Sequence, residues 1–285
     1  MLDRRVRGPG VAAVTAPARD ELGVYGGAEP TRVGATLIEQ AGIHPVADTH
    51  RYGPAWRQAT LWFTTNVEVS GLFIAALAAT LGLGFTLGLV ILIGGAVLGT
   101  AVFAYMVTWG PKAGVSQLGL ARMTFGKSVA LPALVQGLTA GGWIALVSLF
   151  GAQAASLLFG IPFWAGALIV LAAVAFLAGG GYEWINQVEA WFAPVMTVLF
   201  GILTWRIFAH HVVLPVRTVH GAALAGAVLL MLAVVLSGSL SWCPYAMDFG
   251  RRMPPGTSSR KVFWFVTAGT LTAGAWNTVS LATPV

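Results

Sequence analysis

Charged side chains are scarce in this chain of 285 residues: Asp, Glu, Lys and Arg together make up 9% of it. Soluble domains carry roughly 25%. Apolar residues make up 57%, and the mean hydropathy is +0.79. So few charges cannot cover a surface that faces water on all sides. The composition therefore predicts an all-α polytopic membrane protein.

The usual markers of an enzyme or a metal site are also missing. The single cysteine, Cys243, excludes a disulfide framework and a cysteine-rich metal centre. His44 and His50 stand six residues apart in a polar loop, and this spacing does not indicate a metal site. The sequence has no Gly-x-Ser-x-Gly, His-Glu-x-x-His or P-loop motif, and the apolar segments hold no paired acids suited to hydrolysis. We expect no catalytic residues and no bound metal, so a membrane enzyme is only a minor alternative.

The net charge of +6 would elsewhere suggest nucleic acid, but the location of the charges matters more than their sum. Residues 1–55 are polar and contain no apolar run long enough for a signal peptide. We interpret them as a cytoplasmic N-terminal tail, disordered up to about Thr31, and residues 56–285 as a transmembrane domain. We expect the lipid bilayer to be a partner of this chain, and we expect no nucleic-acid partner.

Seven apolar segments follow the tail, and each is compared with the roughly 20 residues that cross a bilayer. Glycine and proline separate them, as in Gly110-Pro111 and Pro254-Pro255-Gly256. The fourth segment is short, and the fifth could begin earlier than we place it. The predicted spans lie near 59–81, 86–108, 130–158, 164–181, 191–209, 222–247 and 262–283.

Lys and Arg set the orientation of these spans. With the N-terminus inside, 14 of the 16 basic residues fall on the cytoplasmic side, and only Arg206 and Arg217 lie outside. The sequence therefore predicts a multi-pass protein of the cell (plasma) membrane with a cytoplasmic N-terminus. His210, His211 and His220 then fall in an outer loop, where they are either passive or sensitive to external pH.

The stretch Gly238–Pro254, GSLSWCPYAMDFGRRMP, holds more small and polar groups than a lipid-facing helix would. Pro244 removes a backbone donor and disturbs the preceding turn. Freed backbone groups at membrane depth are tolerated only where they face protein or line a water-filled cavity. The stretch predicts either a broken helix that presents Trp242 to a ligand, or a helix that ends near Trp242 in the interfacial belt.

The first span is also interrupted, between Thr64 and Gly71. Its amide, hydroxyls and carboxylate are costly in lipid unless they face a cavity or partners. Glu68 is the only acid that we place well inside a span, because Glu183 and Glu189 fall at a cytoplasmic junction. Breaks in the first and sixth spans are typical of an inverted-repeat transporter with five helices per repeat. The alternative is that these polar groups simply join helices.

The third span contains Gly137 and Gly141-Gly142, directly followed by Trp143. Small residues permit close helix approach, and the indole could project into the bundle. A lone Trp in a span is more often packing. Together with Trp242, however, it would offer two aromatic faces for a planar ring.

These residues resemble the purine–cytosine permease family, the nucleobase–cation symporters, from about Ile38 onward. The matching blocks are IEQAGIHPVADTHRYGPAW, WFTTN, GPKAGVSQLGLARMTFGK, GGW and SWCPYAMDFGRRMPPGTSSRKVFW. The resemblance implies a leucine-transporter-like inverted-repeat fold, here the first repeat plus two helices of the second. It also implies uptake of a nucleobase or related heterocycle coupled to sodium or protons. No cofactor is expected beyond a sodium ion as the coupling ion.

The resemblance also supplies candidate site residues. The family commonly holds the ring between a Trp of the third helix and an aromatic residue of the sixth, and Trp143 and Trp242 stand at the matching places. The candidates for substrate binding are Trp143, Trp242, Asn66 and Ser239, and those for cation coupling are Thr65, Asn66, Glu68 and Ser70.

The chain departs from the family pattern in two ways. Val147 stands one turn after Trp143, where members that carry purines or cytosine often have an amide. The family has about twelve spanning helices, whereas this chain ends at the seventh. We therefore expect either a partial chain of a symporter, or a non-transporting fragment or interaction subunit, and we expect the chain alone not to catalyse coupled transport.

Overall fold

The computed structural model describes residues 45–209 and 214–282, except for the side chains at positions 181–183 and 186. All described residues belong to one compact unit, 32–285. They form helices and loops, and no strand occurs among them. The α-helices are α1 (Arg57–Asn66), α2 (Val69–Thr80), α3 (Phe85–Val107), α4 (Gly110–Ala113), α5 (Gln117–Phe125), α6 (Ala130–Phe159), α7 (Phe163–Gly179), α8 (Gly181–Ala209), α9 (Gly221–Leu240), α10 (Ala246–Gly250) and α11 (Ser259–Asn277). The 3₁₀ turns are η1 (Asp48–His50), η2 (Gly126–Val129), η3 (Cys243–Tyr245) and η4 (Thr278–Ala282).

The long helices confirm a polytopic helical membrane protein. Among the described residues, four helical runs are long and apolar enough to cross a bilayer, and the bent pair α1–α2 makes a fifth. The helix α7 is apolar but has only 17 residues. It and α11 occupy the two other predicted spans. The four runs are Phe85–Ala113, Gln117–Phe159, Gln187–Ala209 and Gly221–Gly250.

The first span is broken where its sequence is most polar. The helices α1 and α2 meet at an angle of 58°, with Val67 and Glu68 between them. Glu68 is fully extended, with φ −146° and ψ 165°. The predicted interruption between Thr64 and Gly71 is therefore confirmed.

The sixth span is interrupted more gently. Its α-helical hydrogen bonding stops at Leu240, a 3₁₀ turn follows with Pro244 in its first positions, and α10 resumes at Ala246. Helical direction is kept through the turn, so Gly221–Gly250 still forms a single run of 30 residues. The predicted end of this span at residue 247 is thus three residues short.

The fifth span begins about ten residues earlier than predicted. The helix α8 starts at Gly181 instead of residue 191, and it keeps Pro194 inside it. The polar stretch before Trp191 stays helical because one face of it contacts α1. Glu189 is therefore part of α8, in the run Gln187–Ala209 that is long and apolar enough to cross a bilayer.

Three buried clusters occur among the described residues; the smallest lies around Val67 and Phe200, and the two larger ones join most of the helices. One joins α1, α3, α10 and α11 around Trp62 and Phe103. The other joins α2, α3 and α9 around Leu83 and Met231. The crossing of α1 and α11 is very close, since a Cβ atom built on Gly269 would lie 2.3 Å from the carbonyl oxygen of Ala59.

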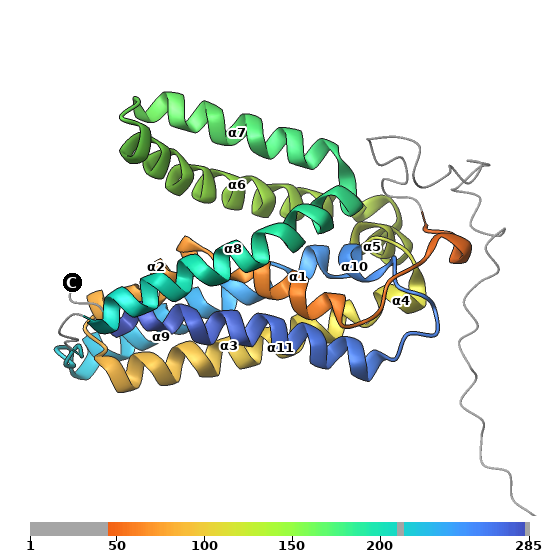
Figure 1. Cartoon of the computed structure of the whole chain (residues 1–285). Helices are drawn as coiled ribbons and strands as arrows, with labels where there is room; N and C mark the ends of the chain where they lie inside the picture. The colour runs from red at the N-terminus through yellow and green to blue at the C-terminus, as the bar shows by residue number, and fades with distance from the viewer. Residues whose placement is uncertain (1–44, 210–213, 283–285) are drawn as a thin grey trace, which may run out of the picture. The chain divides into compact units, whose positions relative to one another are not determined.

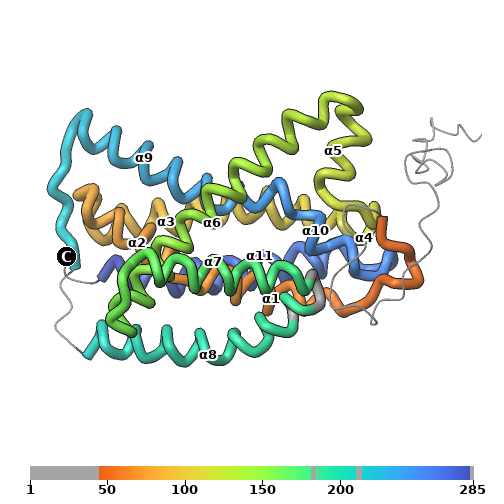
Figure 2. Tube along the Cα trace, turned by 90° about the horizontal axis from the view of Figure 1, so that it is seen from above, coloured from red at the N-terminus to blue at the C-terminus, as the bar shows by residue number. Residues whose placement is uncertain are grey.

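Helices α6 and α7 run side by side as a hairpin that touches the other helices at few places (Figures 1 and 2). Close contact within the hairpin occurs at Gly151 and Gly166. Gly137 and Gly141-Gly142 would permit a close helix approach, but a Cβ atom added there would meet nothing within 4 Å. Gly141 and Gly142 are instead exposed on the surface of α6.

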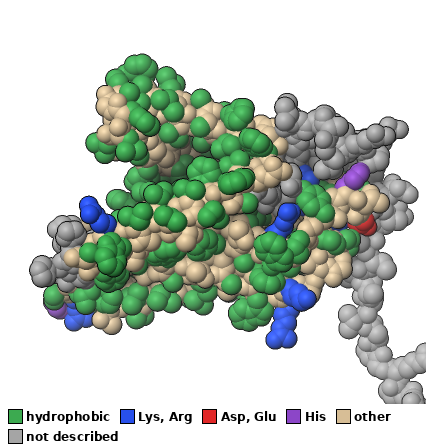
Figure 3. All heavy atoms as spheres, in the orientation of Figure 1, with side chains coloured by type: hydrophobic (Ala, Val, Ile, Leu, Met, Phe, Trp, Pro, Cys, Tyr) green, Lys and Arg blue, Asp and Glu red, His purple; other side chains and the backbone are tan. Residues whose placement is uncertain are grey.

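The outer surface of the helices is apolar, as a lipid-facing surface must be. In Figure 3 hydrophobic side chains cover the length of the helices, while Lys and Arg gather toward their two ends. Large side chains such as Leu158 and Trp191 are 78% and 79% exposed. Such exposure fits lipid contact, because acyl chains are as apolar as leucine.

Candidate substrate and cation site

Trp62 of α1 is completely buried and joins the two interrupted spans. Its ring meets Phe103 of α3 edge to face, with the centroids 4.4 Å apart. It meets Trp242 and Phe249 in the same manner, at 5.3 Å and 5.0 Å. We call Trp62, Phe103, Trp242 and Phe249 the aromatic cluster.

Gln58 ties this cluster together by hydrogen bonds. The indole Nε1 of Trp62 donates to Gln58 Oε1 at 3.0 Å, and Gln58 Nε2 donates to the carbonyl oxygen of Phe249 at 3.0 Å. Gln58 is only 2% exposed, so both bonds form away from water. The first half of the first span is thus fixed to the second half of the sixth.

Trp242 follows the end of α9 and is half-buried against the cluster of α1 and α3. It therefore packs against the interior of the bundle. Two residues after Cys243, the Tyr245 hydroxyl donates to the carbonyl oxygen of Gln136 on α6 at 2.5 Å. This bond brings the third span to the break in the sixth.

Trp143 lies on the face of α6 that meets this break. It is seven residues after Gln136, which is nearly two turns, or about 10 Å along the axis. Its side chain is half-buried. Its ring contacts no other aromatic ring among the described residues, so Trp143 and Trp242 do not stack on each other. Their pairing around a ligand stays a prediction.

Polar groups surround the break in the first span. Asn66 Nδ2 donates to the carbonyl oxygen of Trp62 at 2.7 Å, so its amide turns back onto its own helix. The main-chain oxygen of Asn66 accepts from Asn277 Nδ2 at 2.9 Å. Asn277 Oδ1 is buried and has no hydrogen-bond partner among the described residues. An acceptor left unpaired at a broken helix is available to a ligand donor or a cation.

Glu68 and Ser70 form a local pair at the same break. The Ser70 hydroxyl donates to Glu68 Oε1, and Ser70 is only 3% exposed. Among the described residues no group of three or more His, Cys, Asp and Glu side chains gathers to hold a metal ion. The predicted role of Glu68 and Ser70 in cation coupling is not tested by this geometry.

Thr65 faces α8. Its hydroxyl lies 2.8 Å from the carbonyl oxygen of Leu61 and 3.3 Å from Glu189 Oε1. The structure thus adds Glu189 to the surroundings of the first span. Ser239 faces α3 instead, because a Cβ atom on Gly99 would lie 2.6 Å from Ser239 Cβ.

The N-terminal residues next to α1 are fastened by a buried arginine. Arg51 donates from Nη1 to the carbonyl oxygen of Pro111 at 2.9 Å and lies 3.2 Å from Asp48 Oδ1. Its guanidinium occupies the space beside Gly114, whose φ of +66° also ends α4. At the same end of the bundle, burial lowers the pKa of the Arg252 guanidinium. His50 lies here in η1, while His44, His210 and His211 lie outside the described residues.

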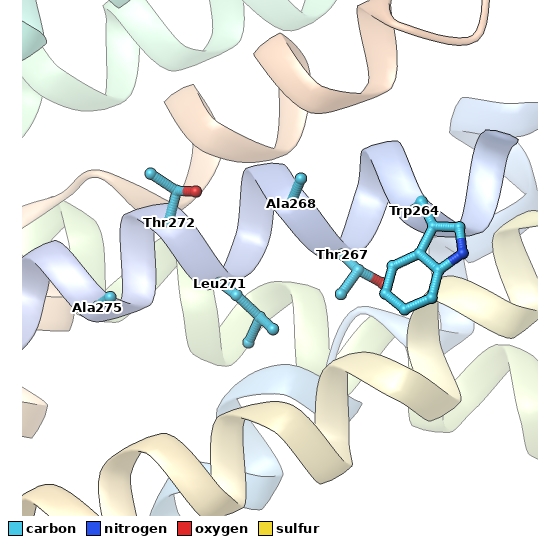
Figure 4. A pocket seen from close by; sticks show the side chains of 6 residues that line it. All are labelled: Trp264, Thr267, Ala268, Leu271, Thr272 and Ala275. Carbon is cyan, nitrogen blue, oxygen red and sulfur yellow. The ribbon is translucent and has the colours of Figure 1, made fainter.

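Among the hollows on the described surface, one lies along α11 and another beside α1. The larger, of about 500 Å³, is lined by residues of α11 alone, on the outer side of that helix (Figure 4). The smaller, of about 180 Å³, lies between α1 and α8. Its lining residues are Trp56, Arg57, Thr60, Leu61, Gln187, Glu189 and Ala190.

A helical membrane protein whose first and sixth spans are both interrupted, with buried aromatic and amide side chains joining the breaks, belongs to the leucine-transporter-like class. The comparison with a solved structure confirms this fold. Mhp1, a nucleobase-cation-symport-1 family transporter in a closed conformation with bromovinylhydantoin bound, matches with a TM-score of 0.68 and 16% identity. The match covers 87% of this chain and 58% of Mhp1.

The chain belongs to the family described as "Permease for cytosine/purines, uracil, thiamine, allantoin", which it matches over residues 45–283. It is 24% identical to the purine-cytosine permease FCY2 of Saccharomyces cerevisiae, over 81% of this chain and 45% of that protein. It is 26% identical to the putative purine-cytosine permease YxlA of Bacillus subtilis, over 84% of this chain and 52% of YxlA. The chain thus spans about half the length of the curated relatives that it matches. Its family consists of permeases and not of enzymes.

Several residues that build this site were not singled out from the sequence. Trp62 opens the block WFTTN but carries no assigned role there, and Gln58 lies outside the matching blocks, although a Gln and a Trp at positions i and i+4 of a helix are a signal for a paired face. Asn277 gives no such signal, because its partner Asn66 lies 211 residues away. Glu189 would have been included in the fifth span if that span had been extended toward the N-terminus by its polar first turn.

Proposed function

We propose that this chain forms the substrate-binding part of a secondary active transporter in the plasma membrane, with its N-terminus in the cytoplasm. The substrate is a nucleobase or related heterocycle, such as cytosine, a purine or allantoin, and its transport is coupled to sodium or protons. The observation that carries the proposal is the aromatic cluster that joins the two helix breaks. Membership of the permease family and the fold of Mhp1 support it.

The arrangement suits a flat ligand with polar edges. The Trp143 and Trp242 rings hold the planar ring between them, since aromatic faces stack on any heterocycle. Gly141 and Gly142, which precede Trp143, are exposed and carry no side chain that would block access to its ring. The unpaired Oδ1 of Asn277 supplies a polar contact, whereas Asn66 and Ser239 make theirs only after turning away from the Trp62 carbonyl oxygen and from α3.

The coupling cation binds at the break in the first span. A carboxylate, hydroxyls and backbone carbonyls are the ligands that hard cations prefer. Thr65, Asn66, Glu68 and Ser70 provide these groups within six residues. Because α1 is fixed to α10 through Gln58, a cation that moves α1 also moves one wall of the substrate site.

Equilibrium binding tests this function. The chain is reconstituted in lipid, and cytosine, uracil, hypoxanthine, allantoin and hydantoin are titrated, with leucine as a non-aromatic control. We expect saturable binding of at least one heterocycle, no binding of leucine, and tighter binding when either sodium is added or the pH is lowered. Equal, non-saturable partition of all six compounds would contradict the proposal. Heterocycle binding whose affinity changes neither with sodium nor with pH would contradict the coupling.

A further inference from the structure

Glu189 is a carboxylate inside a spanning helix, and the proposed substrate and cation sites do not use it. It lies in the run Gln187–Ala209 of α8 and faces α1. An ionisable side chain within a membrane span is costly and usually marks an ion or proton pathway. The contacts of its two oxygens define its chemistry.

The first oxygen, Oε1, lies 3.3 Å from the Thr65 hydroxyl, which also lies 2.8 Å from the carbonyl oxygen of Leu61. A threonine hydroxyl carries one proton and can donate it to one acceptor only. The shorter contact assigns that proton to Leu61. The carboxyl group of Glu189 then completes both hydrogen bonds only when it carries a proton of its own and donates it to Thr65.

The second oxygen, Oε2, is excluded from solvent and has no hydrogen-bond partner among the described residues. An ionised carboxylate with one oxygen in this state lacks compensation for its lost hydration. In the described part of the chain, the one group within hydrogen-bond distance of the Glu189 side chain is the Thr65 hydroxyl, which is already bonded to a carbonyl oxygen, whereas a metal cation takes several oxygen ligands at once. A proton is the cation that this site can hold.

A route for that proton leads from the hollow of about 180 Å³ between α1 and α8. Glu189 lines it together with Arg57, Thr60 and Gln187, beside the first two turns of α1. Arg57 is the titratable group that faces the hollow from α1, and it forms no ion pair with Glu189 in the described structure. The helix α7, which also contacts α8, contains no titratable residue. Glu183 of α8 lies outside the described side chains.

We propose that Glu189 is a proton-binding site. When protonated it joins α8 to α1 through its hydrogen bond to Thr65, and the proton reaches it through this hollow. The inference rests on the proposed transport function, because the proton gains a role only where α1 moves in a cycle. Without that proton, the single hydroxyl proton of Thr65 can serve either the Leu61 carbonyl oxygen or the carboxylate, so one of the two hydrogen bonds is lost and a charge remains beside α1. Proton release therefore loosens the half-helix that carries Trp62 and Gln58.

Infrared difference spectroscopy on the reconstituted chain tests the protonation state without any transport. We expect the C=O stretching band of a neutral carboxyl group at neutral pH, its loss at alkaline pH, and a clear decrease of this band in Glu189→Gln. The matched control, Glu68→Gln, removes a different carboxyl group of the spans, while Asp248 near the end of the sixth span stays in both variants, and it should keep the Glu189 band. A neutral-carboxyl band that is unchanged in Glu189→Gln would overturn the proposal.

A second variant guards against misfolding of the first. Thr65→Val keeps the shape of the side chain but removes the hydroxyl, so the Glu189 band should move to higher frequency. A band that does not move would also overturn the proposal, because the proton would then lie elsewhere. Heterocycle binding measured on the same samples separates the two claims. A Glu189-dependent band without binding would refute the transport function alone, and binding without that band would refute the proton site alone.

Discussion

Removal of the Trp62 side chain should lower the free energy of unfolding of the bundle more than removal of an exposed indole does. The ring is fully buried between three other aromatic rings, with centroid distances of 4.4, 5.0 and 5.3 Å. Trp62→Ala vacates roughly 140 Å³, and a cavity costs about 24 cal/mol per Å³, which gives roughly 3 kcal/mol. Loss of the edge-to-face pairs adds about 0.5–1.5 kcal/mol for each. Because lipid replaces water outside the bundle, this cost comes from lost packing.

Trp62→Phe separates packing from hydrogen bonding. It keeps an aromatic ring but leaves Gln58 Oε1 without its donor, which should cost about 1–3 kcal/mol. Trp191→Ala is the matched control, because this indole is 79% exposed and should cost little.

The assay is reversible unfolding of the purified chain in mixed micelles by increasing detergent fraction, followed by circular dichroism. We expect the free energy of unfolding to fall in the order Trp191→Ala, Trp62→Phe, Trp62→Ala, from smallest to largest loss. Equal losses for Trp62→Ala and Trp191→Ala would refute the placement of Trp62 at the centre of the bundle.

Three further results are expected. Gly269→Ala should destabilise the α1–α11 crossing by about 1–3 kcal/mol in the same assay, since its Cβ would lie 2.3 Å from the Ala59 carbonyl oxygen, whereas Gly274→Ala, with open space around it, should not. Cys243, a half-buried free thiol beside the sixth-span break, should react with a small thiol reagent in native membranes and react more slowly with substrate bound; a failure to label except after denaturation would remove it from the cavity. Glu68→Gln should alter the pH or sodium dependence of heterocycle binding, and unchanged dependence on both would leave Glu68 with a structural role.

The positions of the helices and the break in the first span could be predicted from the sequence because both depend on local composition. A run of apolar residues has to be a helix in lipid. The polar residues from Thr64 to Gly71 could not remain in an unbroken lipid-facing helix. The structure accordingly bends by 58° at Val67 and Glu68.

The start of α8 could not be predicted in this way, because its first turns depend on a neighbour. Glu189 remains in the helix because its carboxyl group faces Thr65 of α1, a residue 124 positions earlier. The same holds for Asn277 and Asn66, which meet across the bundle. Glycines illustrate the opposite error: Gly141 and Gly142 have the composition of a close helix contact, yet the neighbouring helix approaches α6 at Gly151.

Heterocycle affinity of the two tryptophan variants tests the central claim most directly. The claim is that a planar ring is held where the third span meets the break in the sixth. Trp143→Ala and Trp242→Ala should each weaken nucleobase binding by about 1–3 kcal/mol, or roughly ten- to a hundred-fold, as loss of a base–aromatic stack does. Trp205→Ala, whose indole is 72% exposed on α8, should bind like the unaltered protein. Unchanged affinity in both Trp143→Ala and Trp242→Ala would contradict the account.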